Sequence, residues 1–161
     1  MEPYPTVPLR QFRVLDQGGG TLSHTGDTSE TIVKTVTIPG NALGPNGLIK
    51  VSSIWSNNNN GNSKSFRWRL GGLAGDVAFV GANTTNISYN DPERTIANAG
   101  VANSQVGRNG GSAGAGASGS SVFTAAIDTT ASVDLVFTVQ LAVGTDNGAL
   151  RAYCVEICHG P

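Results

Sequence analysis

Charged side chains are scarce in this chain of 161 residues, where Asp, Glu, Lys and Arg together make up 13% of the sequence. Soluble proteins usually contain about twice that share. Ten basic residues face eleven acidic ones, so the formal net charge is −1. Such a balance creates no field that would draw the chain to nucleic acid or to an anionic membrane surface. We therefore expect no nucleic-acid partner.

Long hydrophobic runs are also missing. No apolar stretch reaches the roughly 18 residues that a bilayer-spanning helix requires, so we expect no membrane insertion. The segment Met1–Pro5 lacks the basic and apolar regions of a secretory signal. The length of the chain suits one domain with one core.

Cysteine occurs only twice, at Cys154 and Cys158, in a segment that we predict to be a strand. Four residues of strand span about 13 Å, whereas a disulfide needs Cα atoms within about 7 Å. A mutual disulfide would therefore need a broken strand. With His159 and His24 the cysteines would give four possible zinc ligands. Structural zinc pairs, however, lie in tight C-x2-4-C turns and not in a strand. We expect free thiols of undetermined role, no metal and no cofactor.

Helix signals are scarce, and alternation with a period of two recurs along the chain instead. The clearest case is Ser132–Val143, where Asp134, Thr138 and Gln140 point away from the apolar face. Such a pattern predicts a long strand with one face on a core. The apolar face consists of Val133, Leu135, Phe137, Val139, Leu141 and Val143.

Other segments alternate in the same way. In Thr31–Ile38 we expect Ile32, Val36 and Ile38 to share one face. Leu48–Trp55 is apolar on both sides, which predicts a strand covered more fully than the others. Two further strands are expected at Ser63–Leu70 and Ala149–Cys158. Weaker candidates are Asp76–Val80, Thr84–Tyr89, Arg94–Asn98 and Ser121–Ile127.

Eight or nine short strands without helices predict an all-β fold, an antiparallel β-sandwich. Asn-Gly pairs between or beside these segments mark turns, because both residues tolerate positive φ. A jelly roll is the preferred topology, since its two sheets bury each other's inner faces. We expect one sandwich domain over residues 21–161, with a Gly/Ser/Ala-rich loop at residues 107–121.

Residues 1–20 stand apart from this pattern. They hold three of the seven prolines, which prevent a helix and favour an extended arm. The arm carries too many apolar side chains for a solvated tail, so we expect it to bind a partner protein. The side chains expected to do so are Tyr4, Val7, Leu9 and Phe12.

Catalytic chemistry has little support. Only His24 and His159 could act as the general base of a triad, and no G-x-S-x-G elbow is present. In Arg67–Arg69, strand alternation turns Trp68 to the core and both arginines outward, toward water or a neighbouring subunit. We expect a protein that is not an enzyme.

An amide-rich loop follows Trp55. Two interpretations stay open: a hairpin turn that uses Asn for its backbone conformation, or a tip that hydrogen-bonds a sugar while Trp55 stacks on it. The amides concerned are Asn57, Asn58, Asn59 and Asn60.

Several short motifs resemble a known group of proteins. They are Ile38–Val51, Trp55–Asn58, Lys64–Gly72, Ala102–Gly107 and Ile127–Thr130, in this order. Together they resemble small virion proteins of tailed bacteriophages, described as head-decoration, head-fibre or tail-fibre-like β-sandwich proteins. None of the motifs is catalytic.

The resemblance covers about residues 30–158 and implies a non-enzymatic structural protein, assembled in the cytoplasm of a bacterial host and carried on the virion. It implies a homo-oligomer, a dimer or trimer, that docks on capsid or tail proteins, and the N-terminal arm is the expected anchor. The alternative is a host-recognition module of a tail fibre or tail tip, binding surface carbohydrate through the amide-rich loop.

Overall fold

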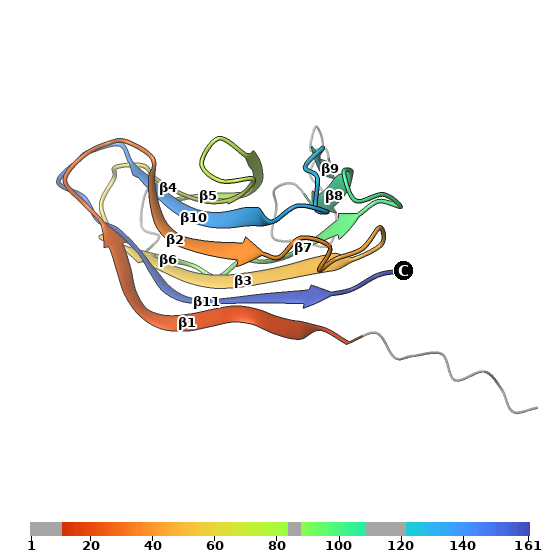
Figure 1. Cartoon of the computed structure of the whole chain (residues 1–161). Helices are drawn as coiled ribbons and strands as arrows, with labels where there is room; N and C mark the ends of the chain where they lie inside the picture. The colour runs from red at the N-terminus through yellow and green to blue at the C-terminus, as the bar shows by residue number, and fades with distance from the viewer. Residues whose placement is uncertain (1–10, 84–87, 109–121) are drawn as a thin grey trace, which may run out of the picture.

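A computed structural model of the chain describes residues 11–83, 88–108 and 122–161. Every regular element in these residues is a β-strand, and the strands form two stacked layers (Figure 1). The strands are β1 (Arg13–His24), β2 (Thr31–Ile38), β3 (Leu48–Asn57), β4 (Lys64–Leu70), β5 (Asp76–Asn83), β6 (Tyr89–Asn90), β7 (Glu93–Asn98), β8 (Gln105–Arg108), β9 (Val122–Ala125), β10 (Val133–Leu141) and β11 (Gly148–Cys158).

The strand order is that of a jelly roll. The larger sheet runs β1-β11-β3-β7-β8-β9, with β6 also paired to β3, and the smaller sheet runs β2-β10-β4-β5. Pairing is nested: β1 pairs with β11, β2 with β10, β3 with β7 and β4 with β5, all antiparallel. This confirms the predicted antiparallel sandwich, to which β8 and β9 add a hairpin beside β7.

The core fills the space between the two sheets. The rings of Trp55 and Phe66 lie 5.0 Å apart and those of Trp68 and Phe79 lie 4.7 Å apart, with Phe137 6.2 Å from both tryptophans. Each fully buried apolar side chain of this size contributes about 1.5–3 kcal/mol to folding. The predicted inward faces of β4 and β10 are confirmed, apart from Val143, which lies beyond β10 and is 39% exposed.

Strand β2 departs from the predicted pattern. Val36 and Ile38 are buried, but Ile32 is 40% exposed. The register against β10 shifts between Lys34 and Ile32, which leaves Val33 as an extra residue. A bulge of one residue reverses the side on which the following side chains point. The prediction that Ile32 shares a face with Val36 was therefore wrong.

Strand β3 is covered on one face only, less fully than predicted. Its buried side chains alternate with partly exposed ones, and Ile54 is 46% exposed. Its inner face packs on the core, whereas its outer face has no layer above it among the described residues. The apolar residues Leu48 and Ile54 therefore contribute to the outer surface of the larger sheet.

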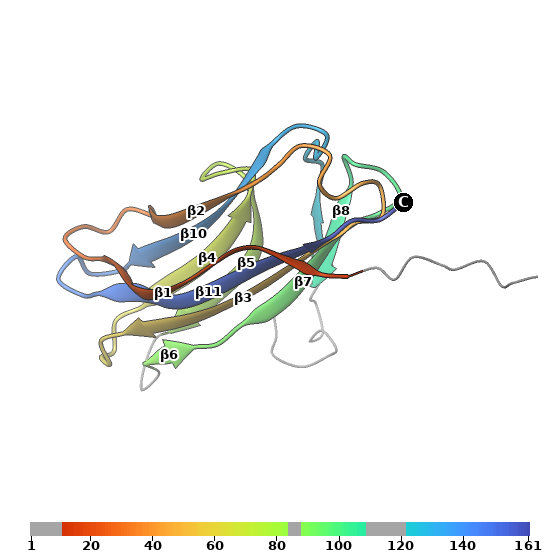
Figure 2. The same cartoon turned by 60° about the horizontal axis from the view of Figure 1, so that its bottom comes forward.

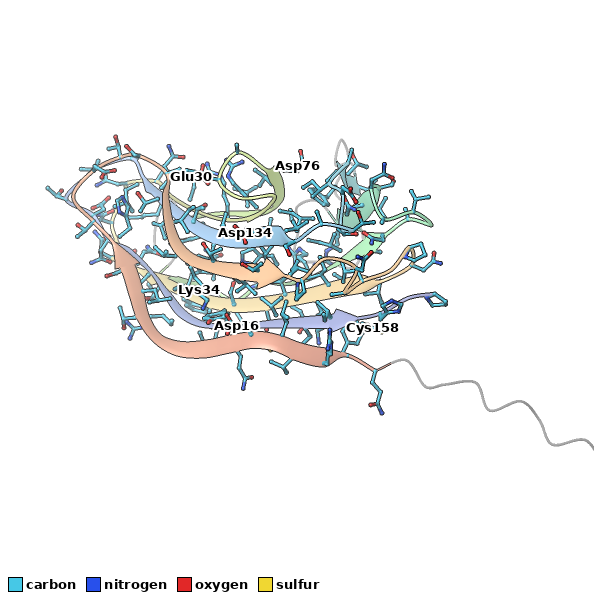
Figure 3. All side chains as sticks on the ribbon, in the orientation of Figure 1. Asp16, Glu30, Lys34, Asp76, Asp134 and Cys158 are labelled. Carbon is cyan, nitrogen blue, oxygen red and sulfur yellow. The ribbon has the colours of Figure 1, made fainter. Side chains whose placement is uncertain are left out.

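Strand β1 begins at Arg13, so residues 13–20 belong to the sheet and not to the predicted arm. Gly18 lies against the ring of Tyr153, where an added Cβ would be 2.8 Å from Cε1. Asp16 on β1 and Lys34 on β2 join the two sheets through a 2.9 Å contact (Figure 3). Tyr153 also donates a hydrogen bond to Asp16, at 3.2 Å.

Some predicted segments lie outside the described residues. Residues 107 and 108 of the predicted Gly/Ser/Ala-rich loop form the end of β8, and the remainder from 109 is not described. Of the candidate strand Thr84–Tyr89, only the end is described, and Tyr89 begins the short β6. Among the described residues there is no helix with the length and hydropathy of a membrane span.

Candidate functional site

The predicted partner-binding arm meets the sandwich at Phe12. Tyr4, Val7 and Leu9 lie outside the described residues. Phe12 is described, directly precedes β1 and is 42% exposed, and Val14 within β1 is 50% exposed. The apolar character of the arm therefore continues onto the surface of the larger sheet.

A row of apolar side chains crosses the outer face of this sheet beside Phe12. Arg13 pairs with Ile157, which places Phe12 level with Cys158. The ladder then continues from Cys158 to Leu48, from Leu48 to Ala97 and from Ala97 to Val106. Residues on the adjacent level of the sheet, such as Ile49, Ile96, Gln105 and Ile157, are buried on the inner face, so alternation turns the row outward. We call the set the outer row: Phe12, Leu48, Ala97, Val106 and Cys158.

Charged side chains border the outer row on the neighbouring level of the sheet. Lys50 lies between Glu93 and Glu156, with Nζ–Oε2 distances of 3.2 and 3.9 Å. The two ends of the row, Phe12 and Val106, are 42% and 36% exposed, whereas Cys158 is only 5% exposed. An apolar strip with a charged border has the composition of a protein-binding surface.

The two cysteines are free thiols on the outer side of β11. Burial and the neighbouring charge of Glu156 raise the pKa of Cys154, so its thiol stays protonated near neutral pH. His24 pairs with Gly148 at one end of β11, and His159 follows its other end. The two histidines are thus separated by the length of a strand. No metal-ligating cluster occurs among the described residues.

The amide-rich loop after β3 is bound to the loop between β10 and β11. Asn58 and Asn60 donate hydrogen bonds to Asp146 Oδ1, at 2.9 and 2.7 Å. Asn58 and Asn147 also exchange backbone-to-side-chain hydrogen bonds, at 3.1 and 3.0 Å. Two of the predicted ligand-binding amides therefore serve the contact between two loops of the fold.

A buried cation completes this polar cluster. Lys64, the first residue of β4, is 1% exposed and donates to Asn60 Oδ1 and to the carbonyl of Asn62, the latter at 2.9 Å. Hydrogen bonds from Asn58 and Asn60, followed by the charge of Lys64, lower the pKa of Asp146 to about 2. The carboxylate is therefore ionised at neutral pH, and the cluster holds one end of the sandwich together.

Trp55 contradicts the sequence-based prediction of a stacking platform. Its side chain is fully buried in the core, between Phe66 and Phe137. The alternation of β3 explains this, because Trp55 shares the inner face with Ile49 and Val51. It offers no ring face to a sugar at the surface, which removes the aromatic half of the predicted carbohydrate site.

The arginines of β4 point outward as predicted, and they bind within the chain. Glu30 accepts two hydrogen bonds from Arg69, at 2.7 and 2.8 Å, and lies 3.3 Å from Arg67. The hydroxyl of Thr138 donates to Glu30 at 2.5 Å. These contacts, led by Arg69, lower the pKa of Glu30. The two arginines on the outer face of the smaller sheet thus have their acidic partner within the chain.

Sequence reasoning missed Glu30 in the ion network of the smaller sheet, and it missed the pair of Lys64 and Asp146 in the loop cluster. Each lies at a strand end or in a loop, where charged residues are common. The one available signal was Lys64, whose position at the start of a strand with Phe66 and Trp68 inward puts it on the buried side. Its partner Asp146 could not be found without the topology.

Comparisons with known proteins give the following findings. No protein-family model matches the sequence, and no curated protein matches it. Three similar solved structures come from infectious bursal disease virus. They are the VP2 subviral particle (10% identity, TM-score 0.46, covering 99% of this chain), the Gt strain (10%, 0.44, 99%) and the Gx strain (11%, 0.42, 100%). This chain spans only 36–37% of those chains. Values this low establish no shared function.

Proposed function

We propose that the protein is a non-enzymatic structural subunit of a bacteriophage particle. In this proposal it is a decoration or fibre-type protein, assembled in the cytoplasm of the host, which docks on capsid or tail proteins through its N-terminal arm. The observation that supports the proposal most is the outer row, because it continues the apolar arm onto the sheet through Phe12. Jelly rolls occur in viral capsid domains, which supports the proposal by analogy of fold only.

The outer row also suits a homo-oligomer, a dimer or trimer, in which neighbouring copies share the docking surface. Size-exclusion chromatography with light scattering on the full chain tests this directly. An oligomer that becomes a monomer in Val106→Lys would support it, because the lysine places a charge at one exposed end of the row. A full chain that is monomeric would refute it.

The carbohydrate-binding alternative has less support. It required Trp55 and the amides from Asn57 to Asn60 to face a ligand together. Trp55 is fully buried, and Asn58 and Asn60 donate their amide hydrogens to Asp146. Binding a sugar there would require these internal hydrogen bonds to be exchanged for bonds to the ligand.

The deciding experiment compares incorporation into particles of the virus that encodes the chain. A chain starting at Gln11 removes the arm and leaves β1, which begins at Arg13, intact. Val106→Lys disturbs the outer row, and Val143→Lys is its control, because Val143 is similarly exposed (39% against 36%) and belongs to the loop before β11, far from the outer row.

We expect both the truncated chain and Val106→Lys to fold and to be lost from particles, whereas Val143→Lys is incorporated normally. Full incorporation of the truncated chain would refute docking through the arm. Absence of the full-length protein from purified particles would refute the virion role itself. The number of copies per particle then distinguishes a shell protein, expected in hundreds of copies, from a tail or vertex protein, expected in about a dozen copies.

A further inference from the structure

A second feature of the surface is a cavity of about 560 Å³ on the side of the sandwich where β5 faces β7 and β8. Figure 1 shows β8 and β9 rising from the larger sheet toward the layer of the smaller one, and β9 contacts β5. The volume lies within the range of about 300–1,000 Å³ that is usual for small-molecule sites. Its walls include Phe79, Gly81, Asn90, Asp91, Arg94 and Arg108.

Arg94 is directed into this space by the register of the sheet. It pairs with Val51, whose side chain is fully buried, while its neighbours Glu93 and Thr95 are exposed. Its guanidinium lies over the ring of Phe79, 5.5 Å from the centroid, and Nη1 donates to the carbonyl of Glu93 at 2.7 Å. These contacts fix the plane of the guanidinium.

Arg108 brings a second positive charge to the same cavity. It ends β8 and lines the cavity together with Arg94. Burial, and then the charge of Arg108, lower the pKa of Arg94. Two like charges at one cavity repel each other, and an anion bound between them offsets that repulsion.

Two acidic residues, Asp91 and Glu93, also line the cavity. Glu93 is 61% exposed and pairs with Lys50 on the outer face of the sheet. Asp91 is exposed at the wall of the cavity. A ligand with an acidic group and neighbouring hydroxyl groups would offer the acidic group to the arginines and a hydroxyl donor to this carboxylate.

We propose that this cavity binds the oxyanion group of a small molecule, a carboxylate, phosphate or sulfate, through Arg94 and Arg108. The planar guanidinium matches these groups, because each presents two oxygens to two parallel N–H donors. The site is distinct from the outer row and does not depend on the virion role. It gives the protein a ligand-binding function in addition to docking.

The test titrates the full chain with inorganic phosphate, sulfate and glucuronate, with glucose as the uncharged control. Binding is followed by calorimetry and by the rise in melting temperature that a ligand of the folded state produces. Arg108→Gln and Arg94→Gln remove one guanidinium each. Arg151→Gln is the control of equal charge change, because Arg151 is exposed on β11 and bonds only Thr21 among the contacts described.

We expect saturable binding of at least one of the three anions, weakened about tenfold or more in Arg108→Gln and Arg94→Gln and unchanged in Arg151→Gln. Tighter binding of glucuronate identifies an acidic sugar as the ligand class, and tighter binding of phosphate or sulfate a free inorganic or phosphorylated anion. No saturable binding of any anion overturns the proposal, as does equal binding by all three variants. If Arg94→Gln fails to fold, Arg108→Gln alone decides.

Discussion

Lys64 and Asp146 form an ion pair that is almost completely withdrawn from solvent. Lys64 Nζ lies 3.4 Å from Asp146 Oδ2, and the two side chains are 1% and 4% exposed. The carbonyl of Asn62 and the side chains of Asn58 and Asn60 complete the oxygen and amide shell of the pair. A buried pair of this kind destabilises the fold strongly when only one partner is removed, because the other charge is left without compensation.

Replacing Lys64 by Met tests this pair. We expect the melting temperature to fall by roughly 5–10 °C, because the carboxylate of Asp146 loses its only cation contact among the described residues. Differential scanning calorimetry measures the shift. Lys50→Met is the control, since Lys50 is 34% exposed and bonds only surface carboxylates. Equal shifts in both variants would contradict a special role for Lys64.

The acid stability of the protein should depend on Asp146. Its pKa is lowered from the ordinary 3.8 to about 2 by the hydrogen bonds of Asn58 and Asn60. Below pH 3.8 the unfolded chain takes up a proton that the folded protein does not, so this stabilisation is complete above pH 3.8 and is lost as the pH falls to about 2.

Urea midpoints measured between pH 4 and pH 2 check this prediction. We expect a shallower pH dependence in Asp146→Asn than in the unchanged protein, whatever the absolute stability of the variant. Asp16 and Glu30, whose pKa values are also lowered, keep part of the acid dependence in both proteins. Identical slopes in the two proteins would show that Asp146 does not titrate as described.

The ion network on the smaller sheet predicts a further difference between two glutamates. Glu30→Gln should lower the free energy of unfolding by about 1–3 kcal/mol, since it weakens charge-assisted bonds to Arg69 and Thr138. Glu93→Gln should change it by less than about 0.5 kcal/mol, because Glu93 is 61% exposed. Urea unfolding of both variants measures the difference, and similar values would count against a structural role for Glu30.

Two glycines should respond oppositely to substitution by alanine. A Cβ at Gly148 would lie 2.7 Å from Val139 Cγ1 and 2.9 Å from Phe66 Cε1, so Gly148→Ala should destabilise the protein by about 1–3 kcal/mol. A Cβ at Gly19 would meet nothing closer than the carbonyl of Arg151 at 3.9 Å. Gly19→Ala should be neutral or stabilise by up to about 1 kcal/mol. Thermal unfolding distinguishes the two, and a tolerated Gly148→Ala would indicate a looser core.

Much of the sandwich could be predicted from alternation alone. The inward faces of Phe66 and Trp68 on β4, and of Leu135 and Phe137 on β10, follow from a period of two in an uninterrupted strand. Prediction failed where the period was broken. The extra residue Val33 reversed Ile32, and no local signal in the sequence marks that bulge.

The candidate sites were less accessible to sequence reasoning, because their residues come together only through strand order. Asn58 is 88 residues from Asp146, and Glu30 is 108 residues from Thr138. Nesting of the strands creates these pairings, and a single sequence gives no order for its strands. Composition indicated polar loops, but it could not indicate that the amides of one loop bind the carboxylate of another.

The pairing of β1 with β11 has a consequence for synthesis. The edge of the larger sheet joins residue 13 to residue 157, so every residue through β11 must be synthesised before the sheet can be completed. Folding of such a topology is slow, because a long loop must close, at a cost in chain entropy, before the stabilising contacts between β1 and β11 form. A chain that ends before β11 therefore lacks the partner of β1 and cannot complete the larger sheet.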